Sequence, residues 1–153
     1  MPGKLKAFHE FRSAMNEKLL SKGNLQLKRF FNLDSQVYVD GALPGKTKEL
    51  MGLVASAVLR CDDCITYHMI QCADLGVTDE EFFETFNVTL IVGGSITIPH
   101  IRRAAETLEE IRASGKRKRD KRGNGNMVNR QAKSGRKGGI GRKDKGVFRK
   151  SCG

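Results

Sequence analysis

The feature that most limits the fold is the spacing of apolar residues, which recur every three or four positions between residues 4 and 114. In the first segment, residues 4–20, charged residues separate the members of this series, which are Leu5, Phe8, Phe11, Met15 and Leu19. This spacing is typical of an amphipathic helix, and no alternating pattern long enough for a sheet occurs. The sequence therefore predicts an all-α fold, a compact helical domain of about five to seven helices.

Further helices are expected over residues 25–38, 47–59, 61–73 and 100–114, and one is expected to begin after Thr78. Thr78 and Glu81 have the spacing of a capping box, in which each side chain binds the other residue's backbone N–H. Gly41 is expected to end the second helix in the left-handed conformation. Residues 96–98 fit a short strand or a continuing buried helix, and Pro99 should open or kink the last helix.

The charge is divided unevenly along the chain. Residues 1–115 carry 13 Lys+Arg against 15 Asp+Glu, whereas residues 116–153 carry 15 against 2, which together give the net +11. We therefore expect a near-neutral helical domain over residues 1–115. Residues 116–153 are basic and Gly-rich, contain few aliphatic residues, and are expected to be disordered.

This basic segment could be an inert extension, an addition to the natural chain, or a contact surface for nucleic acid. Binding would occur through phosphate neutralisation. Phe148 is its one aromatic residue, so base stacking has little support and any binding should be non-specific.

The location of the protein is inferred from its four cysteines and its apolar runs. The chain lacks a charged-then-apolar leader, so the cysteines favour the reducing cytoplasm, where a close pair is usually catalytic or metal-binding. No apolar run approaches the ~20 residues of a membrane helix, so no membrane association is expected.

Two thiols and an imidazole lie within eight residues, at Cys61, Cys64 and His68. On a helix these positions share one face. A C-x-x-C pair either interconverts with a disulfide or binds a metal. Redox use favours a helix that begins near Cys61, because the free N–H groups and the dipole of a first turn stabilise a thiolate.

His68 follows Cys64 by one helical turn and could accept its proton as a general base. Glu49 is a candidate to orient that base, since it adjoins the apolar run of residues 50–59. On one continuous helix Glu49 and His68 would be nearly ~30 Å apart. A break before Cys61 and an antiparallel return could bring them together.

A zinc site is the main alternative, because Cys61, Cys64, His68 and Cys72 resemble a zinc-knuckle series. On a helix, however, these four ligands would be strung over ~16 Å and could not surround one ion. Cys72 fits a small core residue, and Cys152 an exposed, incidental thiol. His9 and His100 fit helix-surface positions, although His100 could approach the site.

Over residues 25–110 the chain resembles the alkylhydroperoxidase D and carboxymuconolactone decarboxylase family. The resemblance consists of Glu49, the Cys61-x-x-Cys64-x-x-x-His68 motif, and Gly76, Val77 and Glu81 after it. It implies an all-α domain that forms a homo-oligomer, commonly a trimer or hexamer, with redox-active cysteines buried near subunit contacts. One position departs from the family's best-studied peroxidases, which have a second His where this chain has Asp63.

The resemblance implies a thiol-dependent peroxidase or disulfide oxidoreductase with no cofactor. Cys64 would attack the peroxide, Cys61 would resolve the product as a disulfide, and Glu49 and His68 would relay protons. A thiol or lipoyl-type compound would supply electrons. Two alternatives remain: a nucleic-acid-associated protein that binds through residues 116–153, and a non-redox lyase or isomerase that uses Glu49 and His68.

Overall fold

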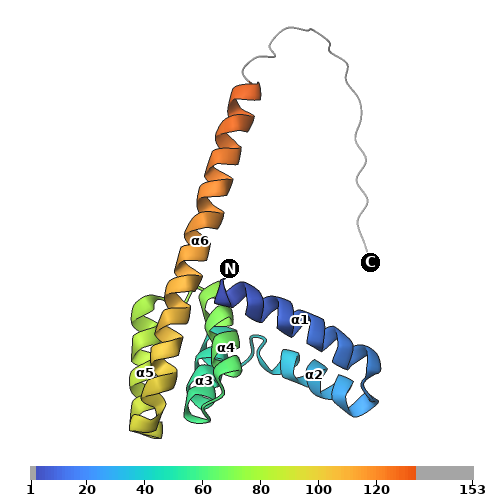
Figure 1. Ribbon diagram of the computed structural model, residues 1–153, viewed down its shortest axis with the longest axis vertical. Helices are drawn as coiled ribbons and strands as arrows, with labels where there is room; N and C mark the ends of the chain where they lie inside the picture. Colours follow the sequence, from blue (N-terminus) through green and yellow to red (C-terminus); the bar gives the residue numbers. More distant parts are fainter. Residues whose placement is uncertain (1–2, 134–153) are drawn as a thin grey trace. The chain divides into compact units, whose positions relative to one another are not determined.

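The computed structural model describes the backbone of residues 3–133 and the side-chain surroundings of residues 3–115. Within these residues the secondary structure is helical, as predicted, with six α-helices and one 3₁₀ turn (Figure 1). In chain order they are α1 (Lys4–Lys22), α2 (Leu25–Val37), α3 (Gly45–Val58), α4 (Asp62–Asp74), α5 (Asp79–Gly93), η1 (Ser95–Thr97) and α6 (Ile98–Lys133). Each of them is either too short or too polar to cross a lipid bilayer.

The hydrophobic core lies among α3, α4, α5 and the first part of α6. Its buried members are Leu53, Ala57, Ile65, Met69, Cys72, Val77, Phe82, Phe86, Ala104 and Leu108. The α3 helix packs against both α4 and α5, so the two sides of α3 face different neighbours. This central position explains why its sequence is largely apolar.

One buried leucine and several hydrogen bonds attach α1 and α2 to this core. Leu5 is buried, and its backbone N–H donates to Glu110 at 3.2 Å. Lys48 donates to the carbonyl oxygens of Val37 and Val39 at 2.9 and 2.7 Å, at the end of α2. Several apolar side chains of α1 and α2 stay exposed, among them Phe11 and Phe30.

The predicted capping box is confirmed at the start of α5. The Glu81 backbone N–H donates to Thr78 Oγ1 at 3.2 Å, and the Thr78 N–H donates to Glu81 Oε2 at 2.8 Å. Lys46 of α3 lies 2.7 Å from the other Glu81 oxygen. The hydrogen bond from Lys46, followed by the one from the Thr78 N–H, lowers the pKa of the Glu81 carboxyl group and outweighs the opposing effect of partial burial.

The expected end of the second helix at Gly41 was wrong, and so was the strand alternative for residues 96–98. Gly41 does not end α2 in the left-handed conformation, since Gly76 and Gly94 are the described glycines with positive φ. The chain leaves α2 at Tyr38 instead, and the Gly41 N–H bonds Leu43 O at 3.1 Å. Residues 96–98 do not form a strand: Gly94, at φ 72°, ends α5, the turn η1 follows over Ser95–Thr97, and Ile98 already begins α6.

The basic segment differs in part from expectation. The chain divides into two units, residues 1–116 and 117–153. Helix α6 continues to Lys133, past the point where disorder was expected to begin. Lys and Arg are good helix formers, which lowers the cost of continuing the helix. Residues 134–153, and with them much of the segment suggested for nucleic-acid binding, lie outside the described residues.

Candidate active site

The candidate site is organised by the sharp turn between α3 and α4. Helix α3 ends at Val58, and Arg60 adopts the left-handed conformation with φ 61°. The Cys61 N–H then donates to Ser56 O at 3.0 Å, and α4 begins at Asp62. The expected break before Cys61 is therefore present, and α4 returns along α3 instead of extending it.

Cys61 and Cys64 form a disulfide at the first turn of α4, with their Cα atoms 5.3 Å apart. Cys61 is the N-cap residue, and its Sγ lies 3.4 Å from the Cys64 backbone nitrogen. Cys64 is exposed and Cys61 is half-buried. When the pair is reduced, the free N–H groups of this first turn favour a thiolate at the same place.

Glu49 and His68 are buried partners across the α3–α4 contact. Glu49 Oε2 lies 2.7 Å from His68 Nδ1, and the two residues are only 4% and 8% exposed. An ionised carboxylate can only accept, so Nδ1 donates this hydrogen bond and carries the ring proton. Nε2 is then the basic nitrogen of the neutral ring. This orientation suits a general base held by a carboxylate.

Gly52 lets the His68 ring lie against α3, and sequence reasoning did not identify it. A Cβ atom at this position would be 2.6 Å from His68 Cε1 and 2.9 Å from Nε2. Glycine inside a helix costs about 1 kcal/mol relative to alanine. A lone glycine within an apolar helical run was the available signal that something packs closely there.

Two tyrosines enclose the other sides of the His68 ring and were also missed. The ring centroids of Tyr38 and Tyr67 lie 5.4 and 5.3 Å from that of His68. Burial, followed by the nearby Glu49 carboxylate, raises the pKa of both phenols. Arg12 of α1 covers the Tyr67 ring, with its Cζ 4.1 Å from the centroid. Both phenols therefore stay protonated near neutral pH.

The structure thus brings the four predicted residues together as two pairs, Cys61 with Cys64 and Glu49 with His68. In the described chain no hydrogen bond joins His68 to either sulfur, and as disulfide sulfurs neither has a proton to donate. Cys72 belongs to neither pair, since it is fully buried and burial raises the pKa of its thiol to about 12. Among the described residues, no three or more His, Cys, Asp or Glu side chains are grouped so that they could hold a metal ion.

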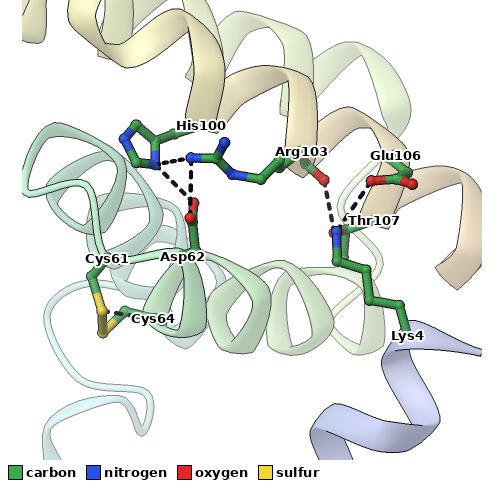
Figure 2. A network of polar contacts seen from close by, with 8 residues as sticks. All are labelled: Lys4, Cys61, Asp62, Cys64, His100, Arg103, Glu106 and Thr107. Atoms are coloured by element: carbon green, nitrogen blue, oxygen red, sulfur yellow. Dashed lines mark hydrogen bonds and ion pairs between the residues drawn. A yellow bond between two sulfur atoms is a disulfide. The ribbon is translucent and has the colours of Figure 1, made fainter.

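His100 approaches the thiol pair through Asp62, the first residue of α4. Its Nδ1 lies 2.7 Å from Asp62 Oδ1, and Arg103 Nη2 lies 3.1 Å from Asp62 Oδ2 (Figure 2). Burial opposes ionisation of Asp62, but the hydrogen bonds from His100 and Arg103 outweigh it and lower the pKa of this carboxyl group. Asp62 is therefore ionised at neutral pH.

The protein is a helical domain that carries a redox-capable C-x-x-C pair at a helix start and a buried Glu–His pair beside it. These features define the class to which the protein belongs. Residues 25–107 match the model of the carboxymuconolactone decarboxylase family. This match covers more than half of the chain, which therefore belongs to that family, as the sequence motifs predicted.

Solved structures agree with this assignment. Two crystal structures of one Thermotoga maritima protein, TM1620, are 61% and 59% identical to this chain, with TM-scores of 0.71 and 0.70. They cover 73% and 72% of this chain, which spans 98% and 94% of theirs. One is described as a family protein with a possible involvement in antioxidative response. A Legionella pneumophila family protein, lpg0406, is 27% identical with a TM-score of 0.66, covering 71% of this chain and 96% of its own.

A curated relative matches about half of this chain. The uncharacterized protein 4 in the cox locus of Paracoccus denitrificans is 30% identical over 82 residues. The match covers 54% of this chain and 74% of the relative.

Proposed function

We propose that the protein is a thiol-dependent peroxidase of the disulfide oxidoreductase kind, with no bound cofactor. The observation that supports it best is the Cys61–Cys64 disulfide at the start of α4, one turn from a buried Glu49–His68 hydrogen bond. A dithiol pair supplies two electrons, and a carboxylate-oriented imidazole can accept and return a proton.

In the proposed first half-reaction, His68 Nε2 accepts the Cys64 thiol proton and the thiolate attacks the terminal peroxide oxygen. The O–O bond breaks, an S–O bond forms, and His68 returns the proton to the departing alkoxide. Cys64 becomes a sulfenic acid and the peroxide becomes an alcohol. Exposure of Cys64 gives a peroxide access to the sulfur.

In the second half-reaction the Cys61 sulfur attacks the Cys64 sulfur, water leaves, and the disulfide forms. A thiol or lipoyl-type dithiol then reduces this bond by thiol–disulfide exchange and becomes oxidised itself. One peroxide and one external dithiol are thus converted to an alcohol, water and an external disulfide. Asp63 stands where the family's best-studied peroxidases have a second histidine, which leaves His68 as the base of this site.

Peroxide consumption with a dithiol as electron donor tests the proposal. Cys64→Ser should reduce turnover to the uncatalysed rate. Cys61→Ser should allow one turnover and accumulate a sulfenic acid detectable by mass spectrometry. Glu49→Gln should lower turnover ~10²-fold or more, because the base loses its orienting charge. Cys152→Ser is the matched control and should not change the rate, whereas unchanged turnover in Cys64→Ser would refute the proposal.

A non-redox lyase is a second candidate, favoured by the fact that the Glu49–His68 pair is complete without either sulfur. Such an enzyme would use His68 to move a proton on a carbonyl substrate. Carboxymuconolactone, the compound in the family name, is the substrate to assay. Activity that survives serine at both Cys61 and Cys64 and is lost in His68→Asn would favour the lyase over the peroxidase.

We also propose that the protein is a homo-oligomer that associates through an apolar groove on α3 and α5. The groove has a volume of about 490 Å³ and is lined by Met51, Val54, Ala55, Val58, Leu59, Val88 and Val92. Leu59 and Val92 are 76% and 64% exposed. Contiguous exposed apolar surface of this kind is typical of a protein interface.

A further inference from the structure

A carboxylate lies directly beside the thiol pair. Asp62 follows Cys61 in the chain and is the first residue of α4. A negative charge so close disfavours a thiolate and raises the pKa of a thiol. A site built to form a thiolate therefore needs something that offsets Asp62.

Two residues of α6 contact this carboxylate. His100 Nδ1 lies 2.7 Å from Asp62 Oδ1, and Arg103 Nη2 lies 3.1 Å from Oδ2. Because the carboxylate only accepts, the proton of His100 is on Nδ1 and points to Asp62. The 2.9 Å approach of Arg103 Nη2 to the same His100 nitrogen then reflects two donors converging on one carboxylate, not a third hydrogen bond.

The other charged groups around the pair do not contact Asp62. Arg60 precedes Cys61, and Asp63 lies between the cysteines on the surface. From α3, the charge of Glu49 is directed at His68. On the α1 side, Lys4 is paired with Glu106 at 3.1 Å, away from the cysteines (Figure 2). Compensation of Asp62 thus comes from α6.

We propose that His100 and Arg103 are positioning residues of the Cys61–Cys64 pair, which hold Asp62 against α6 and offset its charge so that the reduced pair forms a thiolate. This inference rests on the proposed redox role of the two cysteines. It assigns a function to the first two turns of α6, whose His100 and Arg103 contact Asp62 and have no described contact with either sulfur. The pair Asp62–Arg103 is about half exposed, so solvent weakens the effect and salt should weaken it further.

The pH dependence of alkylation tests the proposal on the fully reduced, full-length chain. Iodoacetamide reacts with thiolates, and mass spectrometry of the peptides separates the two motif cysteines from the others. Arg103→Gln should raise the apparent pKa of the more acidic motif thiol by about half a unit to one unit. His100→Ala should act in the same direction, and His100→Asn, which can still donate to Asp62, should restore much of the wild-type value.

A double variant separates positioning from a direct effect of charge. In an Asp62→Asn chain Arg103 loses the partner that holds it, so adding Arg103→Gln should then have little effect on the thiol pKa. An equal shift in both backgrounds would overturn the role of Asp62, and no shift in either would overturn the proposal entirely.

Arg112→Gln is the matched control for general destabilisation. Arg112 is also on α6, and its Nε lies 2.7 Å from Oδ1 of Asp79, the first residue of α5, as Arg103 contacts the first residue of α4. Arg112→Gln should lower the melting temperature without moving the thiol pKa. A thiol shift in Arg112→Gln as large as in Arg103→Gln would contradict the proposal.

These measurements need no peroxide. A wild-type chain that lacks peroxide turnover but shows the expected thiol shifts would refute the proposed peroxidase and leave this inference standing. Normal peroxide turnover in the wild type, together with an unchanged thiol pKa in Arg103→Gln, would support the peroxidase and refute this inference.

Discussion

At the scale of single residues, the site depends on how closely His68 can approach α3. The imidazole is oriented by Glu49 and lies directly over Gly52. Glycine is required because any side chain there would occupy the space of the ring. Glu49 and His68 were identified from the sequence, but they can meet only because Gly52 has no side chain.

Gly52→Ala should displace His68 from Glu49. Overpacking of this kind costs about 1–3 kcal/mol of unfolding free energy, and peroxide turnover should fall at least tenfold, because the base is no longer oriented. Turnover and chemical denaturation of the same preparation give both quantities.

Gly115→Ala is the matched control for this substitution. Gly115 is also helical, but a Cβ there would meet nothing within 4 Å. Since alanine is the better helix former, this variant should be stabilised by up to about 1 kcal/mol with unchanged turnover. A normal rate in Gly52→Ala would contradict the role given to Gly52.

The thiol of Cys72 differs from those of the motif cysteines, because burial keeps it protonated. Desolvation by burial raises the pKa of Cys72 to about 12, with a smaller contribution from the Glu49 charge. A raised pKa favours the protonated form, so at pH 8 only about one molecule in ten thousand carries this thiolate.

Iodoacetamide at pH 8 should therefore label the motif cysteines of the reduced native protein and leave Cys72 unlabelled. Labelling of Cys72 should appear only after denaturant unfolds the core and restores an ordinary thiol pKa. Peptide mass spectrometry before and after denaturation measures this difference. Rapid native labelling of Cys72 would show that the core around it is open.

At the scale of elements, the starts of α4 and α5 show two ways to begin a helix. The N-cap of α4 is Cys61, and that of α5 is Thr78 within a capping box. The first uses a sulfur, a weak acceptor, at 3.4 Å, whereas the second uses two oxygen acceptors at about 3 Å. The less well capped helix is the one that carries the redox pair.

Thr78→Ala should destabilise the protein by about 1 kcal/mol, because the Glu81 N–H loses its acceptor at the helix start. Denaturant unfolding followed by circular dichroism measures the change. Ser35→Ala is the comparison: that hydroxyl donates to Asn32 O on the surface of α2, so the change should stay within about 0.5 kcal/mol. Equal effects of the two substitutions would argue against the capping box as a source of stability.

At the scale of the whole molecule, many large apolar side chains of the domain remain exposed. The groove on α3 and α5 is a continuous part of this exposed apolar surface. A charge placed in this groove would have to be desolvated on association, which is costly without a partner.

Leu59→Glu and Val92→Glu should each weaken the proposed self-association by at least tenfold. Sedimentation velocity over a range of concentrations measures the change in subunit number. Leu75→Glu is the matched control, because Leu75 is 49% exposed but lies outside the groove. A monomeric wild-type chain, or variants that assemble as the wild type does, would contradict the proposed interface.

The amino-acid sequence alone was enough to predict the helical fold class, the start of α5 and the break before Cys61. These are local properties: apolar spacing, a capping box and a short motif depend on neighbours along the chain. It also singled out Glu49, Cys61, Cys64 and His68, because their spacing is that of the family.

The remaining features of the fold and the site depend on how the helices pack against one another. The conformations after Gly41 and around residues 96–98 depend on how consecutive helices meet, and local preference could not fix them. Gly52, Tyr38 and Tyr67 became part of the site only once α2, α3 and α4 were packed together. His100 and Arg103 stand about forty residues from Asp62 along the chain, and only folding brings the His100 ring and the Arg103 guanidinium to its carboxylate.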